Sequence, residues 1–166
     1  MHADDVIRLL GLYPHPGEGG YYRETWRSTL VAPETALPAG YGGGRSFGTA
    51  IYYLVTSESF SALHQVRGDE LFHFYLGDPV EMFLIFPGGD WEKPVLGNDL
   101  AAGHLPQRIV PGGVWQGLRL AEGGRFALLG TTMTPGFELS DFEVGDRKRL
   151  VREYPALEEL IARYAR

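Results

Sequence analysis

The stretch SALHQVRGDELFHFYLGD, residues 61–78, holds the side chains of this sequence that are best suited to chemistry. His64, Glu70 and His73 follow one another closely there, among apolar and aromatic residues typical of β-strands. Imidazole and carboxylate groups can bind a divalent metal, and they can also work together as a general acid and base. A third interpretation is a hydrogen-bonded polar patch inside a barrel. The residue types alone leave the three interpretations open.

The alternation of side chains along a strand decides which of these residues share a pocket. Successive side chains point to opposite faces, so an inward Glu70 predicts that Phe72 and Phe74 also face inward. His73 and Tyr75 would then face the other side, unless a bulge reverses the parity. His73 is therefore a ligand-binding candidate that depends on the orientation of its strand.

Two further segments carry candidate ligand-binding residues. HPGEGGYYRET, residues 15–25, brings His15, Arg23 and Glu24 together. Arg23 can bind a carboxylate or phosphate through two parallel N–H groups, or it can pair with Glu24 at the surface. Trp115 can stack on a planar or sugar ligand, or it can be an ordinary core residue.

Composition limits the classes of protein and partner. A chain of 166 residues with 44% hydrophobic residues favours a single domain, residues 1–166, around one core. The net charge of −6, without a basic stripe outside DRKRLVRE, argues against nucleic acid as a partner. No apolar run approaches the ~20 residues that span a bilayer. The first residues carry acids where a secretion signal carries basic residues, so we expect a cytoplasmic protein without a membrane partner.

The elements that must position these residues are mostly short strands. The pattern predicts a helix over 3–12, an early strand over 21–27 and an irregular surface loop or flap over 32–46. A helix is predicted in the final segment, 154–166. Turn residues separate eight more predicted strands: 47–55, 60–66, 70–76, 80–86, 91–96, 107–110, 114–120 and 126–133. This spacing predicts an all-β antiparallel sandwich or barrel with short N- and C-terminal helices.

Two motifs in these strands resemble those of the cupin superfamily. Glu70 is followed by six residues and Gly77, and His64 stands where the first cupin motif has its first His. PGGVWQ, residues 111–116, resembles the second motif, with Gln116 in place of its final His. The chain also looks like the cupin subfamily called DUF985 or Cupin 5, through residues 14–28, 49–79 and 109–120. The resemblance implies a jelly roll that is usually dimeric and is similar in shape to the dTDP-sugar 3,5-epimerases.

The resemblance also indicates which metal ligands this chain keeps and which it lacks. A cupin typically binds its metal through three imidazoles and one carboxylate, whereas Val66 and Gln116 stand here at two of the histidine positions. Absence of Cys means that only His and oxygen ligands remain. We therefore assign no certain cofactor, and expect at most a depleted, weak divalent-metal site formed by His64, Glu70 and Gln116.

The expected function follows from the same comparison. The similar epimerases use a barrel His as base, beside a carboxylate, and a Tyr as acid, which implies His64 as base and Glu70 as its orienting partner. Tyr53 is the candidate acid among the neighbouring phenols of Tyr52, Tyr53 and Tyr75. Gln116 would bind polar groups of the substrate. We expect an isomerase, epimerase or lyase acting on a polar metabolite such as a sugar or nucleotide sugar, in a homodimer. The alternative is a non-catalytic module that binds a small ligand.

Overall fold

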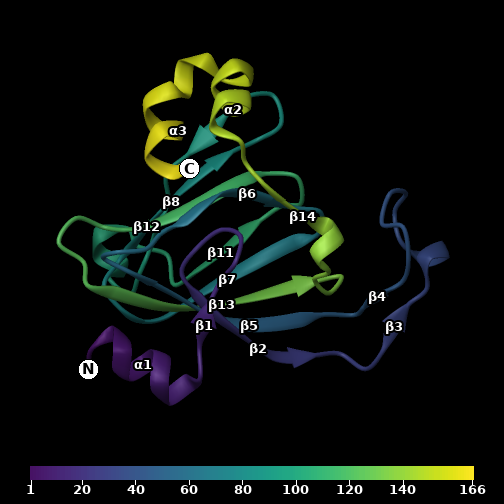
Figure 1. Cartoon of the computed structure of the whole chain (residues 1–166), viewed down its shortest axis with the longest axis horizontal. Coiled ribbons are helices and arrows are strands. Elements are labelled where there is room, and N and C mark those ends of the chain that lie inside the picture. Colours follow the sequence, from purple (N-terminus) through teal and green to yellow (C-terminus); the bar gives the residue numbers. More distant parts are fainter.

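The computed structural model describes residues 1–166 and contains two large antiparallel sheets that face each other (Figure 1). The first sheet has the order β1 (Tyr13–Pro14), β2 (Tyr21–Arg27), β5 (Thr49–Thr56), β13 (Phe126–Thr134), β7 (Asp69–Gly77) and β11 (Gln107–Val110). The second has the order β10 (Val95–Leu96), β8 (Val80–Ile85), β12 (Trp115–Leu120), β6 (Ser61–Val66) and β14 (Phe142–Val144), and β9 (Trp91–Glu92) pairs with β8. This arrangement confirms the predicted all-β fold class.

The main core lies between the two sheets because their strands alternate apolar side chains toward each other. β7 shows the predicted parity: Glu70, Phe72 and Phe74 are buried, while His73 and Tyr75 are more exposed. The buried cluster contains Tyr53, Val55, Phe72, Phe74, Val80, Met82, Leu84, Leu96, Val110, Val114, Leu118, Ala127 and Leu129. Burial of Glu70 within this apolar layer places its carboxyl group inside the sandwich.

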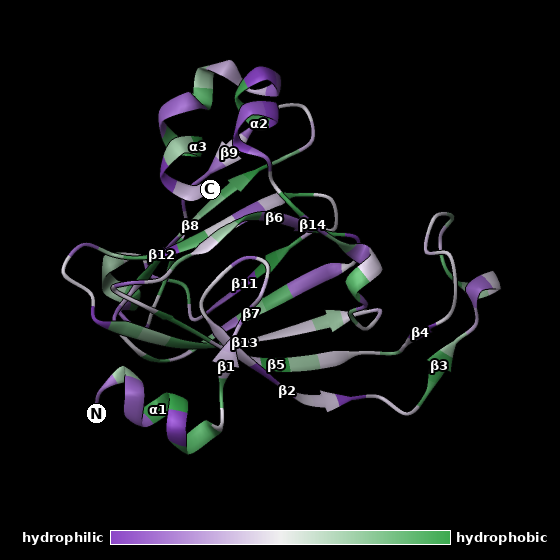
Figure 2. Ribbon diagram, in the orientation of Figure 1, coloured by the Kyte–Doolittle hydropathy of each residue, from purple (hydrophilic) through white to green (hydrophobic).

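Short helices cover part of each sheet's outer face (Figures 1 and 2). Helix α1 (Ala3–Leu10) packs Val6 against Leu54, Phe126 and Leu128 of the first sheet. Helices α2 (Arg147–Glu153) and α3 (Glu158–Tyr164) cover the second sheet, where they bury Leu63, Phe83, Ile85, Trp115, Leu150, Leu157, Ile161 and Tyr164. No helix combines the length and the apolar character needed to cross a membrane.

Most predicted elements are present with shifts of a few residues at their ends. The 91–96 prediction was wrong as one strand, because Lys93 and Pro94 separate β9 from β10. Residues 146–153 carry no predicted helix, yet they contain α2, whose N-cap Asp146 accepts a hydrogen bond from the Arg149 N–H. Helix α2 was missed because Leu150 is its only buried residue, which leaves little apolar periodicity to recognise.

The segment predicted to be irregular, 32–46, is a hairpin-like arm with short paired strands, β3 (Val31–Ala32) and β4 (Arg45–Ser46), and a 3₁₀ turn at Glu34–Ala36. Its base is fixed by a buried ion pair in which Arg45 Nε lies 2.7 Å from Asp141 Oδ2. Asp141 belongs to the 3₁₀ turn Leu139–Asp141, just before β14. The 3₁₀ turns Leu100–Ala102 and Pro155–Leu157 complete the elements.

Candidate functional site

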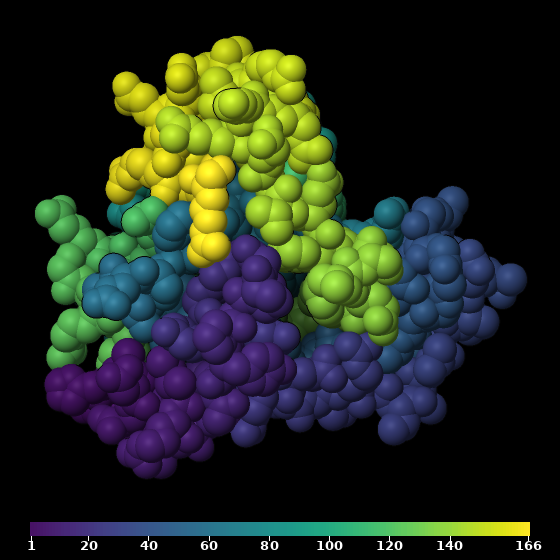
Figure 3. Space-filling model, in the orientation of Figure 1, coloured from purple at the N-terminus to yellow at the C-terminus, as the bar shows by residue number.

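A cavity of about 420 Å³ opens between the sheets, and it is within the size range of small-molecule sites. Figure 3 shows a recess between the purple N-terminal segment and the yellow-green segment that precedes α2. The lining residues come from β1, β2, β5, β6, β7, β13, β14 and the loops after β1 and β13. They are Tyr13, His15, Glu18, Tyr22, Glu24, Arg27, Thr49, Ile51, His64, Val66, Glu70, Thr131, Met133, Phe137, Glu138, Leu139 and Phe142.

The loop between β1 and β2 brings Glu18 into this cavity, and Figure 1 shows it crossing the open side between the sheets. Gly19 and Gly20 both have positive φ, 102° and 71°, a conformation that favours glycine. The Ala62 N–H donates to the Glu18 carbonyl at 2.8 Å, and the Tyr53 hydroxyl donates to the Gly19 carbonyl at 2.8 Å. These contacts fix the backbone on both sides of the Glu18 side chain.

Glu18 and His64 form a buried ion pair at the inner end of the cavity. His64 Nδ1 lies 2.8 Å from Glu18 Oε2 and also 2.8 Å from the Ala62 carbonyl oxygen. Because both neighbours are acceptors, Nδ1 carries a proton and donates to them. Burial lowers the pKa of His64, but the charge and hydrogen bond of Glu18, together with the charge of Glu70 and the Ala62 carbonyl, outweigh it and raise the pKa to about 9. The charge of His64 in turn holds the pKa of Glu18 below its ordinary value, although burial raises it.

Gln116 links the other side of His64 to Glu70. Strand pairing sets Gln116 of β12 directly beside His64 of β6, and Glu70 comes from β7 in the opposite sheet. The amide Nε2 of Gln116 lies 3.2 Å from His64 Nε2 and 2.6 Å from Glu70 Oε2. Burial raises the pKa of Glu70 above its ordinary value, against the opposing charge of His64. The side chains of His64, Glu70 and Gln116 therefore converge at the inner end of the cavity.

The protonation of His64 and the orientation of Gln116 are coupled. A neutral His64 accepts from the amide N–H at Nε2, whereas a protonated His64 requires the amide oxygen there. When the Gln116 amide oxygen faces His64, it also faces Glu70. The carboxyl group of Glu70 must then carry a proton to donate to this oxygen. The raised pKa values of His64 and Glu70 both act in the direction of this second arrangement. Gln116 thus ties the proton on His64 to a proton on Glu70.

The residues at this position do not fit a divalent metal. The side-chain amide of Gln116 fills the space between His64 Nε2 and Glu70 Oε2, where these two ligands would have to meet the ion. Val66 is buried on the cavity wall and offers no ligand atom. No group of three or more His, Cys, Asp or Glu side chains is arranged to hold a metal. One imidazole, one carboxylate and one neutral amide are a poor set for a transition metal.

An ion-pair cluster lies farther out along the cavity wall. Arg27 donates from Nε and Nη2 to the two oxygens of Glu24, at 3.1 and 2.8 Å. Its Nη1 donates to Glu138 at 2.8 Å, and its Nη2 also donates to the Phe137 carbonyl. Arg27 thereby joins β2 to the segment that leads into β14.

Two of the sequence candidates lie away from this cavity. Trp115 is buried under α2, with the Arg149 guanidinium 5.3 Å from its ring centre, so the structure contradicts its predicted stacking on a ligand. His73 is on the opposite face of β7, as its strand parity predicted, where it bonds with Thr132 and Gln107.

Arg23 and Tyr53, two further candidates, do not line the cavity. Arg23 is exposed on β2 and does not line the cavity, whereas its neighbour Glu24 does. Tyr53 is fully buried behind the wall, with burial raising its pKa well above the ordinary value. Its hydroxyl supports the loop that carries Glu18, and a part for it as an acid stays a prediction.

Sequence reasoning missed Glu18 and Arg27 and gave His15 no role. A single acid between glycines, as in PGEGG, is a local signal for a constrained carboxylate, but its partner His64 is far away in the sequence. His15 Nδ1 accepts from the N–H groups of Gly17 and Glu18, each at 3.2 Å. Its proton is therefore on Nε2, which faces no protein acceptor. Burial lowers the pKa of His15, so this ring is neutral.

Comparison with known proteins agrees with this fold. The model of the family described as Cupin superfamily (DUF985) matches residues 4–145, nearly the whole chain. An uncharacterized protein of Saccharomyces cerevisiae is 30% identical over 133 residues, which are 75% of this chain and 66% of that protein. A crystal structure of a protein from Shewanella oneidensis is 34% identical, with a TM-score of 0.87, and covers 100% of this chain and 98% of its own.

A more distant likeness concerns the fold alone. Oxalate decarboxylase of Bacillus subtilis, in its structure at pH 4.6, has a TM-score of 0.55 and 12% identity, over 92% of this chain and 37% of that chain. At this identity the match supports the jelly-roll architecture and says nothing about the reaction.

Proposed function

The chain belongs to the DUF985 family of the cupin superfamily, and we propose that it is an isomerase, epimerase or lyase acting on a small polar metabolite. The observation that carries the proposal is the buried pairing of His64 with Glu18 beside Glu70, on the wall of one cavity. Buried groups with shifted pKa values at a cavity are typical of sites of proton transfer. Proton transfer at a carbon atom is the step that these reaction classes share.

The pKa values suggest a different division of roles from the one inferred by resemblance. With a pKa of about 9, His64 is protonated near neutral pH and is a poor base there. Glu70, whose pKa is raised by burial, is the better proton acceptor once it is ionised. We therefore assign the base to Glu70, which is ionised in the arrangement in which the Gln116 amide donates to both Glu70 and the neutral ring of His64. Glu18 and Gln116 position His64 and Glu70.

The proposed reaction begins when Glu70 removes a proton from a carbon atom beside a carbonyl group. The electron pair of the broken C–H bond moves onto the carbonyl oxygen. The free Nε2–H of His15 donates to that oxygen. Delivery of a proton from water to the other face completes an epimerisation. Return of the proton from Glu70 to the neighbouring carbon, while the hydroxyl proton of that carbon passes to the former carbonyl oxygen, completes an isomerisation. In an elimination the electron pair returns to form a C=C bond as a group leaves the next carbon with its bonding electrons and takes up a proton.

Deuterium exchange tests this function even when the product is unknown. The protein is incubated in D₂O with a panel of aldoses, ketoses and amino sugars, and the mass of each compound is then measured by mass spectrometry. We expect one of them to gain deuterium with the parent protein and to gain none with Glu70→Gln. The matched control Glu58→Gln changes an exposed acid outside the cavity and should exchange like the parent.

Non-catalytic binding is the second candidate function. The observation that favours it is that both ring nitrogens of His64 already have protein partners, Glu18 and Ala62 at Nδ1 and Gln116 at Nε2. A compound that binds in the cavity and is recovered without deuterium after long incubation would replace the enzyme proposal with this one.

A further inference from the structure

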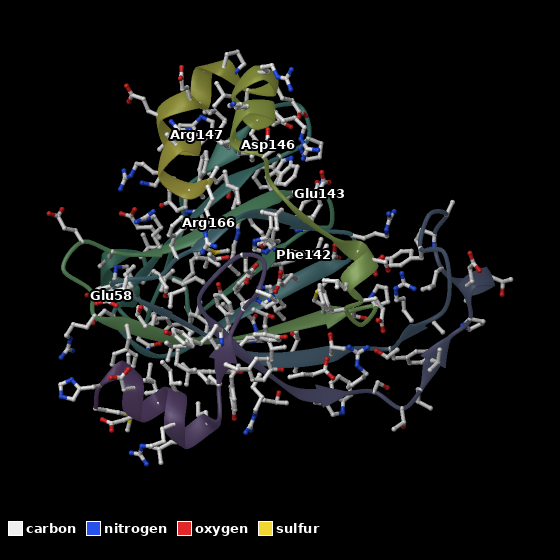
Figure 4. The ribbon with its side chains drawn as sticks, in the orientation of Figure 1. Glu58, Phe142, Glu143, Asp146, Arg147 and Arg166 are labelled. Carbon is white, nitrogen blue, oxygen red and sulfur yellow. The ribbon has the colours of Figure 1, made fainter.

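One wall of the cavity is a continuous series of rings. Tyr13 and Tyr22 meet edge to face at 4.5 Å between ring centres, and His15 contacts Tyr22 at 4.7 Å. Phe142 follows at 5.8 Å from His15 and 5.3 Å from His64. Figure 4 labels Phe142 at the start of β14, on the inner side of the molecule. Flat ring faces of this kind bind other rings, and tyrosine faces also attract cations.

The remaining polar wall is dominated by carboxyl groups. Glu18, Glu24, Glu70 and Glu138 line the cavity, against Arg27 and His64 as its only cationic side chains. Arg27 is already held by Glu24 and Glu138. The positive charge of His64 is likewise compensated by Glu18 at 2.8 Å. Neither cation is left free to receive a phosphate or carboxylate group.

An anion entering this cavity would lose hydration and meet acidic side chains without gaining a free cationic partner. Such an arrangement rejects anions, because like charges brought together in a partly closed site cost several kcal/mol. An uncharged or positively charged molecule meets no such penalty. It can also donate N–H or O–H groups to the carboxylates while its ring lies against Tyr13, Tyr22 and Phe142.

We propose that this cavity selects a non-anionic small molecule with a flat or apolar ring face, and that it excludes phosphorylated and carboxylated metabolites. This ligand selection rests on the proposed function in one respect: both concern the same cavity, and the selection names the class of ligand that the cavity binds. It retains an unphosphorylated sugar as a substrate. It rejects the nucleotide sugar that the family resemblance suggests.

Three probes of one shape and different charge test the selection: tyramine (cationic), tyrosol (neutral) and 4-hydroxyphenylacetate (anionic). Titration near pH 7 is followed by NMR of the ¹³C-labelled rings of Tyr13 and Tyr22 and by calorimetry. We expect tyramine and tyrosol to bind at concentrations up to about 10 mM, and the anion to bind at least about tenfold more weakly. The difference between tyramine and the anion should shrink as salt is added.

A pair of double variants tests the cause. Glu24→Gln with Glu138→Gln frees the guanidinium of Arg27 and should raise the affinity for 4-hydroxyphenylacetate at least about tenfold. These two carboxylates have 38% and 47% exposed side chains, so the fold should persist, which circular dichroism checks. The matched control, Glu58→Gln with Glu143→Gln, removes the same charge away from the cavity and should leave the affinity unchanged (Figure 4).

Three outcomes would overturn the selection: an anion that binds the parent as tightly as tyramine, no binding by any probe at about 10 mM, or equal effects of the two double variants. Failure of the proposed proton transfer would leave the order of binding intact. A reversed order of binding would leave deuterium exchange by Glu70 intact, so the two proposals fail separately.

Discussion

The carboxylate of Glu18, in a loop near the N-terminus, lies 2.8 Å from Nδ1 of His64 in the middle of β6. Both side chains are almost fully buried, so this contact joins two charges in a place that water barely reaches. An ion pair of this kind is expensive to break from one side only, because the remaining charge stays buried without a partner. Four of the five predictions below concern this contact or its neighbours.

Glu18→Gln should lower the pKa of His64 from about 9 to its ordinary value of 6.5 or below. The substitution removes the charge that raises this pKa, while the lowering effect of burial stays. Imidazole signals followed by NMR over a pH titration measure the change. An unchanged His64 titration would show that Glu18 is not its partner.

The free energy of unfolding should fall as pH rises from about 6.5 to about 9. The folded-state pKa of His64 lies above its unfolded value of 6.5, so its contribution is complete below 6.5 and is lost as pH passes through 9. The raised pKa of Glu70 acts in the same direction. Because a shift of one pKa unit corresponds to about 1.36 kcal/mol, the raised pKa of His64 implies a loss of roughly 3 kcal/mol in the free energy of unfolding. Urea unfolding at a series of pH values measures this loss. Glu18→Gln should make the free energy of unfolding depend less on pH over the same range.

His64→Ala should destabilise the protein by about 3–5 kcal/mol, because Glu18 then remains buried and unpaired. Adding Glu18→Gln should restore at least about 1 kcal/mol of this loss, as a double-mutant cycle would show. His73→Ala is the comparison on the other face of the sheet. It removes hydrogen bonds to Thr132 and Gln107 and should cost only about 1 kcal/mol. Purely additive losses at Glu18 and His64 would argue against the ion pair.

Val66→His combined with Gln116→His should create a metal site that the parent lacks. Val66 lines the cavity beside His64 and Glu70, and Gln116 already lies between the ligands, so the variant offers three imidazoles and one carboxylate. We expect tight binding of Ni²⁺ or Zn²⁺ by the double variant. Calorimetry and elemental analysis decide: a full equivalent of metal in the purified parent would contradict the ligand count, and no gain in the variant would contradict the motif alignment.

We propose a homodimer formed through the outer face of the first sheet. Trp26, Tyr75 and Ile109 are exposed there, and a second copy would remove them from water. Light scattering should give twice the chain mass of 18.4 kDa at low micromolar concentration. Ile109→Lys should weaken the dimer. Leu139→Lys, at a more exposed apolar residue on the cavity side, should leave it intact, and a monomeric parent would end the proposal.

Local sequence pattern was sufficient to predict most of the longer strands and the inward face of β7, because these depend on alternation and on turn residues. His64, Glu70 and Gln116 could be recognised because each lies on a strand whose buried face was predictable, and their motifs resemble those of a known family. The parity of β7 likewise predicted that His73 lies on the other face.

The surroundings of those residues depend on the packed fold. Glu18 reaches His64 through a loop whose course no periodicity describes, and the two are paired across a long stretch of chain. Trp115 is adjacent to Gln116 in sequence, yet alternation sends it to the opposite face, under a helix that the apolar pattern does not reveal. The pKa of His64 depends on burial and on the charges of Glu18 and Glu70. Burial and contacts between distant segments exist only after the sheets have packed, so the order of residues along the chain could not supply them.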